Sequence, residues 1–117
     1  MEIELDGPGT FAVDVVGVSQ YQGVLETVAE DGGAVVATVV LEESNPHDDQ
    51  AVAVTIAGER AGYLSRANAR RYRADLAAVG APNLIVRCKA KVVGGFETRG
   101  GERAQFGLKL DLPMLGA

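Results

Sequence analysis

Several kinds of residue are almost missing from this 117-residue chain, and each shortage excludes a class of protein. The single cysteine, Cys88, excludes an internal disulfide framework and a multi-cysteine zinc site. The single histidine, His47, leaves little material for a histidine-based metal site. No apolar run approaches the roughly 20 residues that a membrane-spanning helix needs, and the acidic N-terminus is unlike a signal peptide. We therefore expect a soluble, cytoplasmic domain with no membrane partner.

Basic residues are missing from the whole first half of the chain. Residues 1–59 carry 12 acidic and no basic groups, whereas residues 60–117 carry 11 basic and 4 acidic groups. This split predicts either a basic surface that faces a polyanion, or two halves that neutralise each other within one domain. With 47% hydrophobic and 23% charged residues, the composition is that of a folded globular protein.

Alternating apolar residues between glycine-rich turns predict six strands, at residues 11–18, 34–42, 51–56, 60–64, 84–93 and 105–112. Ser65 stands at a helix N-cap position, and an apolar stripe follows at helical spacing, formed by Ala69, Tyr72, Leu76 and Val79. We therefore expect one main α-helix at about residues 65–79. Closure of many short strands removes exposed sheet edges, so the pattern favours a mainly β fold, a small six-stranded β-barrel.

The chain reads as a single domain at residues 11–112, followed by a tail at residues 113–117. Residues 1–10 contain Gly7-Pro8-Gly9 and are interpreted as a leader or a loosely held first strand. Residues 23–30 are consistent with either a short helical turn or an irregular crossing.

Two polar clusters are candidates for chemistry. The loop at residues 42–50 reads Glu-Glu-Ser-Asn-Pro-His-Asp-Asp-Gln, but it lacks the glycine and the final glutamate of a calcium loop. No nucleophile stands at a recognisable spacing from His47 and Asp48, so we expect no metal, no cofactor and no catalysis. The simplest interpretation is a turn in which Asn and Asp cap backbone amides. Arg66, Arg70 and Arg73 share a face of the expected helix, which is either solvated or an anion site.

Four segments form a more specific pattern: Val15-Val16-Gly17-Val18, Tyr21-x-Gly23-Val24, Asn45-Pro46-His47-Asp48-Asp49-Gln50-Ala51-Val52-x-Val54, and Gly62-Tyr63-Leu64-Ser65-Arg66. Over about residues 11–112 the chain resembles the HIRAN domain, which occurs in SWI/SNF-type fork-remodelling translocases and as stand-alone bacterial proteins. The resemblance implies an OB-like barrel that binds single-stranded DNA and captures its free 3′-hydroxyl end, in DNA repair or replication-fork processing.

The resemblance also assigns roles to the 42–50 loop and the helix. Asp48 would accept a hydrogen bond from the 3′-hydroxyl and would repel the phosphate of a continuing strand. Asn45 would line the same loop, and His47 would stack on a base. Arg66 would contact a phosphate, and Arg70 on the same helix face would add to this cationic surface.

The remaining candidate residues lie just after the first strand and in the last strand. Phe106 matches an aromatic residue that contacts a base, although its alternation with Leu108 favours the core. Ser19-Gln20 replaces an Arg-aromatic pair of the DNA-binding relatives, and the aromatic residue is displaced to Tyr21. Gln20 and Tyr21 are the candidates from this segment, and the loss of one stacked base costs on the order of 1–3 kcal/mol.

Three functional hypotheses follow from these residues. The leading one is a non-enzymatic module that binds single-stranded DNA 3′ ends. The first alternative is a protein-interaction or targeting domain that has lost DNA binding, motivated by Ser19-Gln20 and the acidic first half. The second alternative is a small metal-dependent hydrolase or nuclease that uses Glu42, His47, Asp48 and Asp49.

Overall fold

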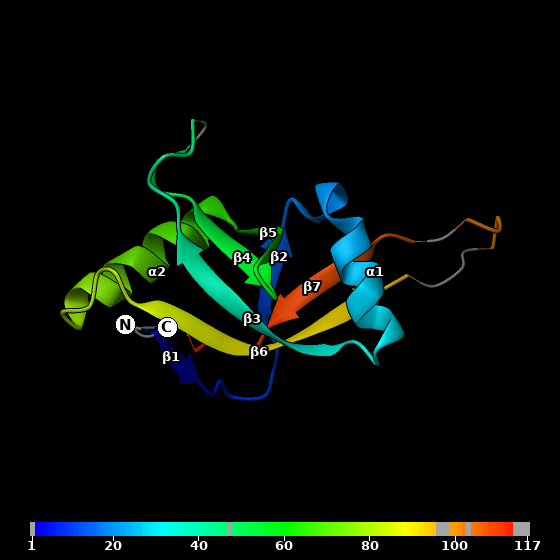
Figure 1. The fold of residues 1–117 in the computed structure, drawn as a ribbon, viewed down its shortest axis with the longest axis horizontal. Helices are drawn as coiled ribbons and strands as arrows, with labels where there is room; N and C mark the ends of the chain where they lie inside the picture. Colours follow the sequence, from blue (N-terminus) through cyan, green and yellow to red (C-terminus); the bar gives the residue numbers. More distant parts are fainter. Residues whose placement is uncertain (1, 47, 96–98, 103, 114–117) are drawn as a thin grey trace.

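The structure of the chain is a computed structural model that describes residues 2–46, 48–95, 99–102 and 104–113. The elements in chain order are β1 (Glu2–Leu5), β2 (Val13–Val16), the 3-10 helix η1 (Val18–Gln20), α1 (Gln22–Glu30), β3 (Ala34–Leu41), β4 (Val52–Ile56), β5 (Glu59–Leu64), α2 (Arg66–Ala78), β6 (Ile85–Gly94) and β7 (Phe106–Leu110). Both α-helices lie outside the sheet, at opposite ends of it (Figure 1).

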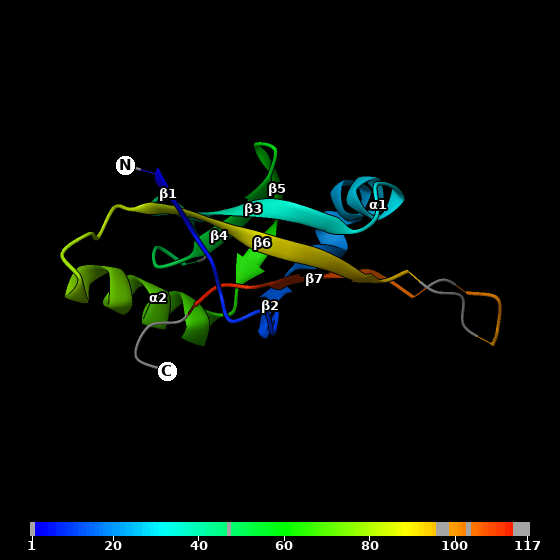
Figure 2. The ribbon, with the colours of Figure 1, turned by 90° about the horizontal axis from the view of Figure 1, so that it is seen from below.

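The sheet closes on itself. Its strand order is β1-β6-β3-β4-β5-β2-β7, and β6 also pairs with β7, so six antiparallel strands form a closed ring. The predicted mainly β fold, a small barrel comparable to an OB barrel, is therefore confirmed. β1 is an extra strand that pairs parallel to the first half of β6, and Figure 2 shows the two strands side by side. Residues 2–5 therefore form a strand, which is one of the two alternatives predicted for residues 1–10.

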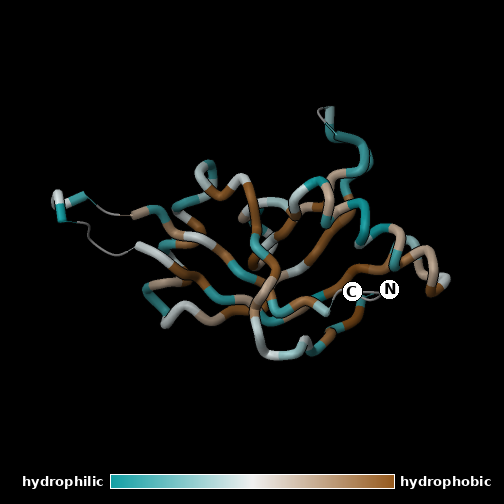
Figure 3. The backbone as a smooth tube through the Cα atoms, turned by 180° about the vertical axis from the view of Figure 1, so that it is seen from behind, coloured by the Kyte–Doolittle hydropathy of each residue, from teal (hydrophilic) through white to brown (hydrophobic). Residues whose placement is uncertain are grey.

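Alternation along each strand places the core inside the barrel. In β6, Val86, Cys88 and Ala90 are buried, while the residues between them are exposed. In β7, Leu108 and Leu110 are buried in the same way. The alternation of apolar and polar residues along the strands is visible in Figure 3, in which the loop between β3 and β4 is mostly hydrophilic.

The helix α2 agrees with the helix predicted at about residues 65–79, because its two capping residues are Ser65 and Val79. Ser65 caps it, because its Oγ accepts a hydrogen bond from the backbone N–H of Asn68 at 3.2 Å. The first three residues of the apolar stripe are buried, whereas the fourth, Val79, is 59% exposed. The helix ends at Ala78, and Gly80 then turns the chain away with a φ of 77°.

Residues between β2 and β3 take the helical alternative. α1 runs from Gln22 to Glu30 and packs Leu25 and Val28 against the core. The first barrel strand, β2, is shorter than expected: Gly17, with a φ of 73°, ends it and starts η1. Within the described part of the chain, neither helix has the length and apolar character needed to cross a membrane.

Candidate functional site

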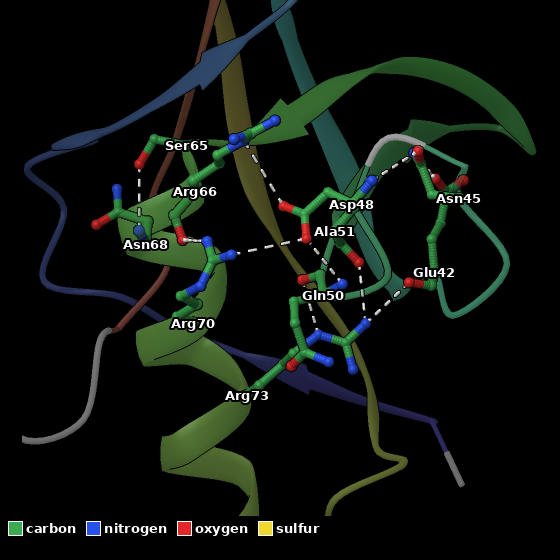
Figure 4. Close-up of polar contacts among 10 residues, drawn as sticks. All are labelled: Glu42, Asn45, Asp48, Gln50, Ala51, Ser65, Arg66, Asn68, Arg70 and Arg73. Carbon is green, nitrogen blue, oxygen red and sulfur yellow. Dashed lines mark hydrogen bonds and ion pairs between the residues drawn. The ribbon is translucent and has the colours of Figure 1, made fainter.

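The loop before β4 lies beside the start of α2. Because β4 and β5 are antiparallel neighbours, with Ala53 opposite Tyr63, the loop that enters β4 and the helix that follows β5 meet at one edge of the barrel. The Asp48 carboxylate, 14% exposed, lies between two arginines of α2 (Figure 4). Its Oδ2 is 3.9 Å from Arg66 Nε, and its Oδ1 is 3.8 Å from Arg70 Nη2. The side chains of Arg66 and Arg70 are 74% and 55% exposed.

Hydrogen bonds within the loop fix the direction of Asp48. The Asn45 side-chain oxygen accepts from the backbone N–H of Asp48 at 3.3 Å, and Asp48 Oδ1 accepts from that of Gln50 at 2.9 Å. The Asn45 amide group donates to Glu42 Oε1 at 3.2 Å. The expected turn with capping Asn and Asp side chains is therefore present, and it is the same feature that presents Asp48 to α2.

Arg73 holds the two ends of this loop together. Its Nε donates to the carbonyl of Gln50 at 2.8 Å, and its Nη2 donates to the carbonyls of Glu42 and Ala51, each at 3.0 Å. Arg73 lies on the helix face predicted for it, but its guanidinium is used within the protein. The cationic face that remains open to a ligand therefore consists of Arg66 and Arg70.

Two neighbouring grooves lie at this end of the barrel. The Asp48 groove, of about 370 Å³, is lined by Gln20, Tyr21, Asn45, Asp48, Tyr63 and Arg66 among others. The Glu42 groove, of about 530 Å³, is lined by Leu41, Glu42, Glu43, Asn45, Arg60 and Tyr63 among others. Asn45 and Tyr63 belong to both, so the two grooves are neighbours. Five of the eight predicted site residues thus line the Asp48 groove: Gln20, Tyr21, Asn45, Asp48 and Arg66.

Tyr63 is a groove residue that was not among the predicted site residues. It precedes the α2 cap by two residues, and its side chain forms a hydrogen bond with that of Tyr21. Burial and the nearby Glu42 carboxylate raise the pKa of Tyr63, so its ring carries a neutral hydroxyl at neutral pH. The guanidinium of Arg60 lies 5.5 Å from the centre of the ring and is also paired with Glu42. The position of Tyr63 at the end of a strand, next to a helix cap, is the signal that could have identified it.

The other three predicted site residues are not among the described residues that line the groove. Phe106 begins β7 opposite Gly94, is half-buried against the core, and its backbone N–H donates to the Gln22 side chain at 2.8 Å. It therefore lies at the end of the barrel next to α1, and its packing agrees with the core expectation from alternation. His47 lies outside the described residues. Arg70 approaches Asp48 from α2 without lining the groove itself.

Charge is balanced differently in the groove and on the strands. Three cations of the strands in the second half each meet an acid of the first half: Arg87 pairs with Glu2, Lys89 with Asp6 and Lys109 with Asp14. The predicted neutralisation between the halves therefore holds for these strands. Among the described residues, no group of three or more histidine, cysteine or acidic side chains is arranged to hold a metal ion.

The class of protein that fold and groove define is a small closed β-barrel with a ligand-sized groove of mixed polarity at one edge. No family model matches the chain, and neither a curated protein nor a solved structure matches it.

Proposed function

We propose that this protein is a non-enzymatic module that binds free 3′-hydroxyl ends of single-stranded DNA, as its resemblance to the HIRAN domain predicts, in DNA repair or replication-fork processing. The observation that carries the proposal is the position of one carboxylate, Asp48, beside two exposed arginines in a groove with tyrosines. Such a groove offers a separate partner to each part of a terminal nucleotide.

Asp48 gives the proposal its selectivity for an end. An ionised carboxylate only accepts hydrogen bonds, so it pairs with a hydroxyl hydrogen and repels a phosphate in the same place. A strand that continued past Asp48, or one that ended in a 3′-phosphate, would bring negative charge to that carboxylate. The Asp48 carboxylate is mostly buried in the loop, which weakens screening by solvent and strengthens the repulsion.

The other parts of the nucleotide have partners nearby. Arg66 and Arg70 are exposed, and their contacts with Asp48 at 3.9 and 3.8 Å are longer than a hydrogen bond, so their guanidinium groups can turn toward a phosphate. Tyr21 and Tyr63 line the same groove and can stack on a base. These two rings compensate in part for the aromatic residue that is missing at Gln20.

The test compares two ends of one oligonucleotide. We expect fluorescence anisotropy to show at least about tenfold tighter binding of a 3′-hydroxyl than of a 3′-phosphate oligonucleotide. Asp48→Asn keeps the acceptor for Gln50 and removes the charge, so the preference should fall toward unity. Asp49→Asn removes the same charge from an exposed neighbour and is the matched control, with the preference retained. Equal affinity of the wild-type protein for both ends would reject end recognition, and a lack of affinity for both would reject DNA binding altogether.

A further inference from the structure

The Asp48 groove has an unusual balance of ionic contacts. In the other ion pairs that the structure describes, one cation meets one carboxylate: Arg60 with Glu42, Arg87 with Glu2, Lys89 with Asp6 and Lys109 with Asp14. At Asp48, two guanidinium groups share a single carboxylate. Within the cluster of Asp48, Arg66 and Arg70, beside the groove, one positive charge is therefore left over, which is the charge that a single phosphodiester would neutralise.

The adjoining Glu42 groove has the opposite balance. Glu42 and Glu43 line it together with Arg60, so one negative charge is left over. Arg60 is already engaged, because it pairs with Glu42 and lies over the Tyr63 ring. A second phosphate that followed the first into this groove would be repelled.

The basic residues of the strands do not extend the cationic surface. Arg87 and Lys89 of β6 are paired with acids in or directly after β1, and Lys109 of β7 is paired with an acid of β2. Lys91 lies 4.9 Å from the centre of the Phe11 ring, and Arg73 is bonded to loop carbonyls. Each basic residue of β6 and β7 therefore has a partner within the protein.

We infer that the groove recognises one terminal nucleotide unit, with one phosphate on its 5′ side and a free 3′-hydroxyl, and that further nucleotides add almost no affinity. The inference rests on the proposed function and narrows its ligand. A free nucleoside 5′-monophosphate and the end of a DNA strand share this chemistry, so both are ligands. The volume of the groove, about 370 Å³, is at the small-ligand end of the range that binding pockets usually occupy, about 300–1,000 Å³.

A length series tests the inference. Thymidine 5′-monophosphate and 3′-hydroxyl oligothymidylates of about two, four and ten nucleotides compete for the protein against a labelled oligonucleotide. We expect competition constants within about threefold of one another. At every ligand length, a plot of the logarithm of the binding constant against the logarithm of the salt concentration should have a slope of about −0.7, the value expected when one phosphate is neutralised. A rise in affinity of more than about tenfold from the shortest to the longest ligand, with a steeper slope, would overturn the inference and leave end binding intact.

A charge reversal sharpens the same experiment. Glu43→Lys turns the net charge of the Glu42 groove from negative to positive and leaves the Asp48 groove unchanged, so this variant should acquire length dependence. Glu26→Lys changes the charge equally on α1, away from both grooves, and should not. If both variants acquired length dependence, the net charge of the protein rather than that of the Glu42 groove would set how affinity depends on ligand length, and the inference would be overturned. Absence of binding at every length in the wild-type protein would overturn the proposed function itself.

Discussion

The loop at the edge of the barrel and the strands of the barrel are held in place by different means. The strands are joined by backbone pairing, and their outward charges meet one to one, as in the Lys109–Asp14 pair at 2.8 Å. The loop between β3 and β4 is irregular, and it is fastened to α2 by side chains, above all by the three hydrogen bonds of Arg73. The strands therefore depend on backbone pairing and on ion pairs between their charged side chains. The groove, by contrast, depends on a few side chains, each with its own set of contacts.

The largest expected effect comes from breaking the loop's attachment. Arg73→Ala removes three hydrogen bonds from a charged donor and leaves three carbonyl acceptors, so we expect the free energy of unfolding to fall by about 3 kcal/mol. Amide exchange in residues 43–50 should accelerate more than exchange in β6. Urea unfolding and hydrogen exchange measure the two effects. Arg70→Ala is the control, since its contacts are exposed and long, and a similar loss in both variants would contradict the assignment to Arg73.

The barrel interior should lose stability at high pH. Burial, with the charge of Asp111 adding to it, raises the pKa of Cys88 from 9.0 to about 11. The native thiol therefore keeps a proton that the unfolded chain releases. The contribution of Cys88 to the free energy of unfolding is fully present below pH 9 and decreases as pH rises toward 11. The loss for this one group is about 2–3 kcal/mol.

Unfolding at pH about 8 and about 10.5 measures this loss. Cys88→Ala should be less stable than the wild-type protein at the lower pH but should lose less on going to the higher one. An equal loss in both proteins would assign the effect to other groups, of which the Tyr72 hydroxyl is one, because burial also raises its pKa.

The junction between the two regions depends on Gly62 of β5. A Cβ atom at this position would lie 2.5 Å from Val15 Cγ1 and 2.7 Å from the carbonyl oxygen of Val16, where β2 and β5 approach closely. We expect Gly62→Ala to destabilise the protein by about 2 kcal/mol through overpacking, as measured by thermal unfolding. Gly58→Ala is the control. Gly58 lies in the open turn of the β4–β5 hairpin with a φ of 83°, so this variant has backbone strain without a steric clash. A larger loss at Gly58 than at Gly62 would contradict the steric explanation.

The smallest expected effects sharpen the comparison of charges. Arg66→Ala and Lys109→Ala each remove an exposed ion pair, so each should change the free energy of unfolding by less than about 1 kcal/mol. Only Arg66→Ala should weaken oligonucleotide binding, because only Arg66 stands at the groove. Chemical unfolding and anisotropy on the same samples provide both readings. Equal weakening of binding by Lys109→Ala would show that the balanced strands are also part of the DNA interface.

Much of the fold could be predicted because its signals are local. The alternation in β7 and the Ser65 cap of α2 each depend on residues a few positions apart, and both were recognised. β1 was left open between leader and strand, since its parallel pairing with β6 joins residues more than eighty positions apart. Val79 belongs to the apolar stripe by its spacing but is exposed, because it lies just after the last residue of α2.

The candidate site was only partly predictable for the same reason. The polarity of the 42–50 loop and the cationic helix face are visible in the sequence, and the structure brings Asp48 and Arg66 together. Tyr63 was not predicted as a site residue, because whether a strand-end tyrosine faces a core or a groove depends on what packs opposite it. The role of Arg73 was missed, since a guanidinium that binds backbone carbonyls has no partner side chain to reveal it.

By itself, the sequence determined the six barrel strands, the start of α2 and the residue types of the loop, because period-two alternation and capping are properties of short segments. Only the tertiary structure decided which charges neutralise one another, which arginine fastens the loop and which two remain beside Asp48. Those choices depend on barrel closure and strand register, which bring residues from distant parts of the chain within a few ångströms of each other.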